Sequence, residues 1–220
     1  LPKKAGLNRF VWNMRYPTIP GVPGVYIEAS YNGHKAPPGR YRMTIRAGDR
    51  TASTTAEILP NPLYSVTPEA YREYHQVMTS MERDLTVMHE MVNDLHAKRA
   101  QIEALLDTLP ADAKFASVKR DGAALVETLK AWDADMVSRR SRAYDDVENY
   151  AQKFTANFMF LVNQTESDLP RVNQSSLDQL EEMSASWTTL RTRGEELQTR
   201  EIPSLNRRLW ELGIGAIWRK

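Results

Sequence analysis

The feature that most constrains this chain is a long run of mainly apolar side chains, spaced alternately four and three residues apart. The run covers residues 74–109 without a break: Tyr74, Met78, Met81, Leu85, Met88, Val92, Leu95, Arg99, Ile102, Leu106 and Leu109. A mean spacing of 3.5 residues is typical of the buried seam of a long helix that packs against other helices. The sequence Thr67-Pro68-Glu69 favours a helix start just before this run, and Pro110 favours a stop.

The sequence after Pro110 predicts further helices over residues 115–137, 151–164 and 173–199, each with apolar residues at helical spacing. Residues 139–150 have no clean period, which predicts an extended connection. A final short helix is expected over 201–212, with Pro203 at a kink or a fresh start. Residues 67–212 are therefore predicted to form a bundle of long antiparallel helices, followed by a tail over 213–220.

The first third of the chain has a different pattern. Residues 40–58 alternate between apolar and polar side chains around a turn at 47–50, which predicts two half-buried strands. Residues 7–12 and 26–31 are expected to be further strands. Four strands are too few for an immunoglobulin-like sandwich, which has about seven. Residues 1–62 are therefore expected to be a partial immunoglobulin/fibronectin-like β-sandwich, with its first strands upstream or supplied by another chain, and the fold class is α+β in separate parts.

Composition excludes several classes of protein. A formal net charge of +1 argues against a nucleic-acid-binding protein, which usually has a strongly basic face. The chain has no cysteine, so it has neither disulfides nor thiolate metal sites. No stretch approaches the roughly 20 apolar residues that cross a bilayer, so no membrane span is expected.

No residue is predicted to be catalytic or to bind a cofactor or metal, and no cofactor is expected. The sequence His89-Glu90 resembles half of a zinc-protease motif, but residue 93 is Asn rather than the second His. His96 lies two turns further on, too far to share one zinc ion with His89. Both histidines are interpreted as polar side chains on a helix face.

Other suggestive groups have structural interpretations as well. Met78, Met81 and Met88 lie on the seam, which favours core packing over a metal site. The paired carboxylates at 181–182 and 195–196 diverge by about 100° around a helix, so they are interpreted as solvated faces.

Three aromatic residues are candidates for binding a partner: Tyr71, Trp210 and Trp218. The alternative for each is packing against a neighbouring domain. The long seam fits an intramolecular bundle and a homodimer equally well.

Two stretches near the N-terminus resemble a known family. AGLNRFVWNMRYP at 5–17 and APPGRYRMTI at 36–45 resemble the region after the β-propeller in bacterial proteins named as glycosyl hydrolases with BNR repeats, relatives of sortilin (Vps10-type) propellers. IPSLNRRL at 202–209 resembles the end of that family's helical region. Asn13 stands where the family usually has Asp. The resemblance implies immunoglobulin-like strands with Trp12 and Tyr41 in their core, then helices, in an exported bacterial protein (periplasmic, surface-bound or secreted).

The preferred hypothesis is a non-catalytic structural or interaction region that supports or docks an upstream propeller, with the propeller or another chain as its partner. One alternative is an accessory part of a sialidase-like glycoside hydrolase, which requires two carboxylates about 5 to 9 Å apart over a sugar pocket. A second is a carbohydrate-binding module, in which Trp12, Tyr26, Tyr31 and Tyr41 form a stacking platform if they are exposed. The alternation of side chains predicts instead that Trp12 and Tyr41 point inward.

Overall fold

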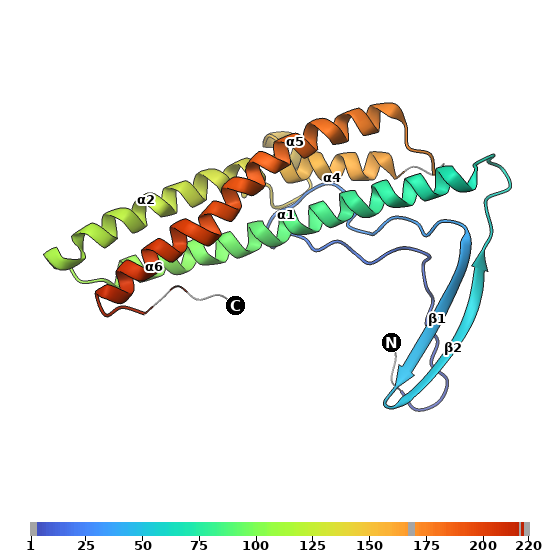
Figure 1. Cartoon of the computed structure of the whole chain (residues 1–220), viewed down its shortest axis with the longest axis horizontal. Helices are drawn as coiled ribbons and strands as arrows, with labels where there is room; N and C mark the ends of the chain where they lie inside the picture. The colour runs from blue at the N-terminus through green and yellow to red at the C-terminus, as the bar shows by residue number, and fades with distance from the viewer. Residues whose placement is uncertain (1–3, 167–169, 216, 218–220) are drawn as a thin grey trace.

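The computed structural model describes residues 4–166, 170–215 and 217. It is a mixed α+β structure, with one two-stranded antiparallel sheet and several helices (Figure 1). The elements are β1 (Gly39–Ala47), β2 (Arg50–Ile58), α1 (Pro68–Thr108), α2 (Ala113–Met136), α3 (Asp146–Asn149), α4 (Phe154–Thr165), α5 (Gln174–Glu196), the π-helix η1 (Leu197–Glu201) and α6 (Ile202–Glu211).

The longest element is α1, with 41 residues, and it starts and stops where the sequence predicts. The hydroxyl of Thr67 accepts a hydrogen bond from the Ala70 amide at 3.2 Å, and Pro68 occupies the first turn. The predicted seam is confirmed: its residues from Tyr74 to Leu95, together with Ile102, are at most 2% exposed. Because this seam runs the length of α1, the other helices can pack along the whole helix.

The apolar core lies between α1, α2, α4, α5 and α6. Helices α1 and α2 run antiparallel around a short turn, and the chain returns through α5 and α6 (Figure 1). The side chain of Asp112 caps α2 by accepting from the Lys114 amide. Where α5 crosses α2, Trp132 Nε1 donates to the carbonyl oxygen of Leu190 at 2.9 Å.

The predicted connection over 139–150 is confirmed as largely non-helical, with α3 as a single short turn. The fresh start predicted at Pro203 is wrong, because α5 continues through η1 into α6 without interruption, whereas the kink predicted as its alternative stays a prediction. Proline cannot donate a backbone hydrogen bond, and the wider π-turn directly before Pro203 changes the hydrogen-bond pattern there. Helix α6 ends at a glycine: Gly213 has a φ of 73°, and the Ile214 amide donates to the carbonyl of Leu209.

The β1–β2 hairpin is confirmed in position, but its predicted half-burial is wrong. Ala47 pairs with Arg50 around Gly48, whose φ is 58°. Met43 is 40% exposed and Ile45 61% exposed, although alternation places them on one face. Trp12 packs on Tyr41 at the base of that face, whereas Met43 and Ile45 stay exposed, and the hairpin projects away from the helices (Figure 1).

The strands predicted at 7–12 and 26–31 are wrong, since neither range forms one. Residues 14–36 instead form a loop, here called the strap, which lies along α1 (Figure 1). Its two limbs are antiparallel and carry the isolated bridge between Arg15 and Lys35. Ile19, Val22 and Ile27 of the strap belong to the same buried cluster as the α1 seam. The strap therefore packs on the helices rather than on the hairpin.

None of the described helices is long and apolar enough to cross a membrane.

Candidate functional site

The most exposed apolar surface in the described chain lies at the hairpin and the segments next to it. Besides Met43 and Ile45, its members are Leu7, Phe10, Val11, Met14, Leu59, Leu63 and Tyr64, all at least 38% exposed. A two-stranded hairpin has little stability of its own in water. Several exposed apolar residues in one region of a protein are typical of an interaction site.

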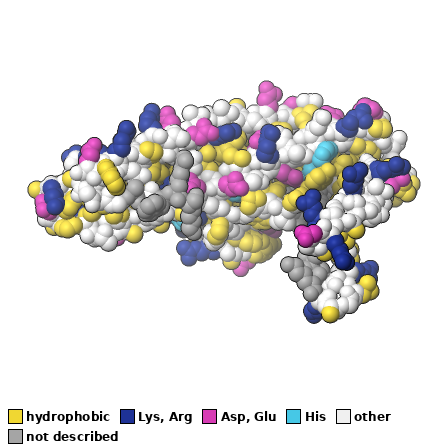
Figure 2. Space-filling view, turned by 60° about the horizontal axis from the view of Figure 1, so that its bottom comes forward, with side chains coloured by type: hydrophobic (Ala, Val, Ile, Leu, Met, Phe, Trp, Pro, Cys, Tyr) yellow, Lys and Arg dark blue, Asp and Glu magenta, His cyan; other side chains and the backbone are white. Residues whose placement is uncertain are grey.

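The two faces of the hairpin differ in chemistry. Tyr41, Met43 and Ile45 lie opposite Ala56, Thr54 and Ala52 on one face. The opposite face carries Arg40, Arg42 and Arg46, all exposed, facing Glu57, Thr55 and Thr51. Figure 2 shows the hairpin projecting from the helical body, with arginines on its surface. The hairpin thus presents an apolar face and a basic face.

The base of the hairpin is tied to the strap by two aromatic residues. The Trp12 and Tyr41 rings lie 5.4 Å apart at 60°. Trp12 Nε1 donates to the carbonyl of Arg15 at 2.9 Å, and the Tyr41 hydroxyl donates to that of Pro37 at 2.6 Å. Both residues are half-buried, so the expectation that they sit deep in a sandwich core is wrong. Their 60° tilt means that the two rings do not lie in one plane.

Beside this base lies a polar cluster that sequence reasoning missed. The His34 amide donates to Glu82 Oε1 at 2.6 Å, and its Nδ1 lies 2.9 Å from Glu82 Oε2. His34 Nε2 lies 2.9 Å from His75 Nδ1. Tyr16 stacks on both imidazoles, with ring centroids 4.4 Å from His34 and 5.1 Å from His75. His34 is only 1% exposed.

The cluster joins the strap to α1, because His34 and Tyr16 come from the strap, whereas His75 and Glu82 come from the helix. Burial, and to a smaller extent the charge of His34, lowers the pKa of His75. Burial also raises the pKa of Tyr74, whose ring meets the edge of His34. Spacing did not reveal the cluster, since His34 and His75 are 41 positions apart and belong to no motif.

His89 also lies under the strap. It is completely buried, and its Nδ1 donates to the carbonyl of Pro20 at 2.6 Å. The interpretation of His89 as a polar side chain on a helix face is therefore wrong, while His96, with a 38% exposed side chain, fits it. Within the described part of the chain, no group of three or more His, Asp or Glu side chains is placed to hold a metal ion.

The structure does not bring the predicted partner-binding aromatics together. Tyr71 is half-buried in the first turn of α1. Trp210 is 76% exposed near the end of α6. In the same part of α6, Arg208 donates a hydrogen bond to Ser117, which lies near the start of α2. Trp218 lies outside the described residues. The start of α1, which holds Tyr71, and the end of α6, which holds Trp210, lie at opposite ends of the helices (Figure 1).

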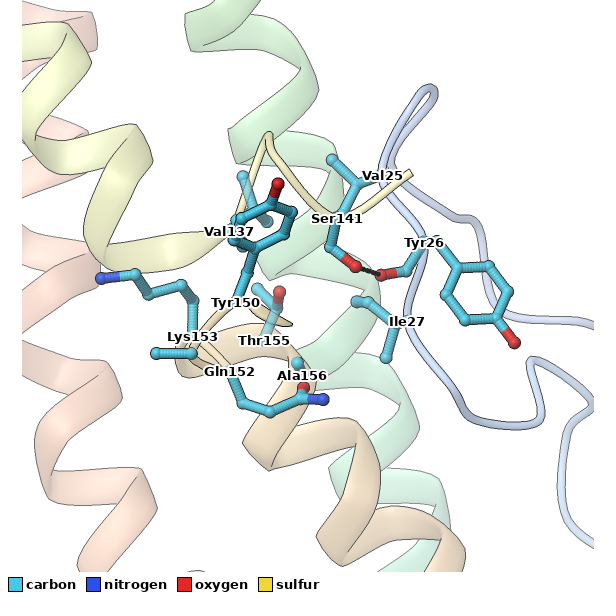
Figure 3. Close-up of a pocket in the computed structure, with 12 residues that line it drawn as sticks. Val25, Tyr26, Ile27, Val137, Ser141, Tyr150, Gln152, Lys153, Thr155 and Ala156 are labelled. Carbon is cyan, nitrogen blue, oxygen red and sulfur yellow. Dashed lines mark hydrogen bonds between the residues drawn. The ribbon is translucent and has the colours of Figure 1, made fainter. Parts of the chain in front are cut away.

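The concave features of the described chain include one small pocket and two open grooves. The pocket in Figure 3 has a volume of about 10 Å³, roughly enough for one water molecule. There the Tyr26 amide donates to the Ser141 carbonyl, and the Ser141 hydroxyl donates to the Tyr26 carbonyl, each at 2.8 Å. These bonds fix the strap to the connection after α2. Two open grooves lie between helices, one of about 310 Å³ between α2 and α6 and one of about 570 Å³ between α4 and α5.

Comparison of the chain with protein-family models, with curated proteins and with solved structures gave no match.

Proposed function

We propose that this chain is a non-catalytic interaction region, in which the apolar face of the β1–β2 hairpin is covered by β-strands from outside residues 1–220. The observation that carries this proposal is the exposure of Met43 and Ile45 on one face of an otherwise regular hairpin. Complete burial of an exposed side chain of this size contributes about 1.5–3 kcal/mol, and covering the exposed parts of Met43 and Ile45 contributes a fraction of that for each. A two-stranded sheet also leaves both outer edges open to pairing with further strands.

Under this proposal the completed unit is an immunoglobulin-like sandwich, and the helices form the bundle that carries it. The resemblance of residues 5–17 and 36–45 supports strands from an upstream β-propeller protein as the source, and an exported bacterial protein as the setting. The strap then serves as the joint between the sandwich and α1. The arginine face stays in solvent or meets acidic groups of the same partner.

The test is amide hydrogen exchange at residues 39–58, measured in the isolated chain and in the full-length native protein. The proposal predicts slow exchange in the native protein and fast exchange in the isolated chain. Ile45→Asp should abolish the protection in the native protein, because it places a charge on the covered face. Thr44→Asp, on the opposite face of the same strand, is the matched control and should keep the protection.

Peptide mapping of the native protein identifies the source of the strands. Peptides upstream of Leu1 that gain protection together with the hairpin indicate the same polypeptide, and a co-purifying chain with that behaviour indicates a partner. Equally fast exchange of the hairpin amides in the isolated chain and in the native protein would refute the proposal.

A further inference from the structure

We infer that the His34–His75 pair is an acid-sensitive latch, which holds the root of the strap on α1 at neutral pH and loosens it when both imidazoles are protonated. The root comprises residues 14–19 and 31–36. This response belongs to the chain itself and does not depend on whether the hairpin binds a partner.

At neutral pH each polar atom of the latch has a compatible role. His34 Nδ1–H donates to Glu82 Oε2, which leaves a lone pair on His34 Nε2. His75 Nδ1–H can then donate to that lone pair across 2.9 Å. Glu82 Oε1 also accepts the backbone N–H of His34, so one carboxylate holds both the backbone and the ring of His34.

A first added proton keeps the latch closed. It leaves one N–H between the two imidazoles, shared by His34 Nε2 and His75 Nδ1, and places a positive charge beside Glu82. The ring of Tyr16, stacked on both imidazoles, adds a favourable cation–π contact.

A second proton opens the latch. Both facing nitrogens then carry hydrogens, so two N–H groups and two positive charges confront each other at 2.9 Å. The single carboxylate of Glu82 cannot compensate both charges at a site where His34 is almost fully buried. When the strap limb that carries His34 moves away from α1, this repulsion is relieved and water can solvate both rings.

The other charged and titratable groups around the pair do not produce an acid response of this kind. Arg15 of the strap bonds to Glu166 at the end of α4 at 2.8 Å, which balances its charge. The amide of Lys35 donates to the same carboxylate at 3.3 Å. Tyr74, on α1, stays neutral because its pKa is raised. The acid response of this region therefore rests on the contact between His34 and His75, with Glu82 as its carboxylate.

Opening the latch affects the hairpin directly, since β1 begins three residues after Ala36. Trp12 and Tyr41 bond to the carbonyls of Arg15 and Pro37, so the base of the hairpin moves with the root. The tip of the strap stays fixed, because Tyr26 and Ser141 exchange two hydrogen bonds that involve no titratable group.

The experiment is residue-resolved amide hydrogen exchange of the whole chain at pH 7.5 and pH 5.0, expressed as protection factors. Three amides report on the root. The Tyr16 amide donates to the His34 carbonyl, the His34 amide donates to Glu82, and the Ala36 amide donates to the Met14 carbonyl. Their protection should fall by about tenfold or more at pH 5.0, since one pKa unit corresponds to a tenfold change. The Tyr26 amide is the internal reference and should keep its protection.

His75→Asn is the decisive variant, because the amide nitrogen of Asn takes the place of Nδ1, donates to His34 and cannot be protonated. In this variant the protection factors of the strap-root amides should fall by less than about twofold between pH 7.5 and pH 5.0. His96→Asn is the matched control on the same helix, and it should respond to acid as the wild type does. Gly33→Ala should loosen the root already at pH 7.5, because the added Cβ would lie 2.6 Å from the backbone of Tyr16 and Pro17.

Unchanged protection of the three reporting amides at pH 5.0 would overturn the inference, and so would a wild-type acid response in His75→Asn. If that variant does not fold, ¹⁵N chemical shifts of the wild-type imidazoles decide instead. His34 and His75 must then titrate in two coupled steps, and independent single-step curves would contradict the latch.

Discussion

Trp132 Nε1 donates to the backbone carbonyl of Leu190, although that carbonyl already belongs to the ladder of helix α5. The bond is possible because α5 lies very close to α1 and α2 at Gly194. A Cβ at that glycine would collide with Met91 Sδ and lie 3.0 Å from Trp132 Cζ2. The approach of the three helices thus depends on one missing methyl group.

We therefore predict that Gly194→Ala destabilises the protein by about 1–3 kcal/mol, despite the better helix propensity of Ala, because overpacking at a helix contact costs that much. Urea unfolding followed by circular dichroism measures the change. Gly122→Ala is the control: its Cβ would meet only the side chain of Leu106, which is partly exposed and can move. That variant should be close to neutral, and an equal loss in both would contradict the prediction.

Asp133 is 5% exposed and accepts hydrogen bonds from Arg139 Nε at 2.9 Å and Nη2 at 2.6 Å. Asp133→Asn removes the charge and forces one donor to face another, so it should cost about 1.5–3 kcal/mol. Glu195→Gln breaks the exposed pair with Arg191 and should change the free energy of unfolding by no more than about 0.5 kcal/mol. Comparable effects of the two variants in chemical denaturation would count against this account.

Burial lowers the pKa values of His75, His89 and His96 below the ordinary 6.5. The unfolded chain therefore binds more protons than the native one as the pH falls through this range. The free energy of unfolding should be highest above pH 6.5 and fall as the pH drops toward 5. Urea titrations at intervals between pH 7.5 and 5.0 measure the slope.

The variant Glu82→Gln should make this pH dependence steeper. The Glu82 carboxylate raises the pKa of His75 against the effects of burial and of His34, so its removal lowers that pKa further. A shallower slope than in the wild type would show that Glu82 does not support the protonated histidines.

The exposure of Ile45 gives a prediction for the isolated chain. Ile45→Thr should change the free energy of unfolding by no more than about 0.5 kcal/mol, because the side chain is 61% exposed. Leu85→Ala, on the fully buried seam of α1, should cost about 2–5 kcal/mol. A large loss for Ile45→Thr in a urea melt would mean that the hairpin face is already covered.

The sequence predicted the helices well, because their signals are local. The seam from Tyr74 onward, the cap at Thr67 and the stop at Pro110 each depend on residues within a few turns of one another. The hairpin was also placed correctly, since Gly48 permits its turn. What covers an element is not local, and so the alternation in β1 predicted a buried face where the structure leaves Ile45 in solvent.

The candidate site was less predictable. His34, His75 and Glu82 meet only because the strap folds back on α1, and no spacing rule connects a loop histidine to a helix 41 positions away. The same fold-back buries His89, which looked like a surface residue. Of the predicted partner-binding aromatics, Tyr71 and Trp210 lie far apart, and Trp218 is outside the described residues. The role of Tyr71 and Trp210 in binding remains a prediction.

The length of α1 has a mechanical consequence. A continuous helix of 41 residues rises about 1.5 Å per residue, so it separates its two ends by about 60 Å. The hairpin leaves one end of this rod, the end of α6 that holds Trp210 lies at the other, and α2 and α4 pack along its side. Domains bound at the two ends would therefore be held at a fixed spacing and orientation. A force applied to the hairpin would be transmitted to the N-terminal end of α1.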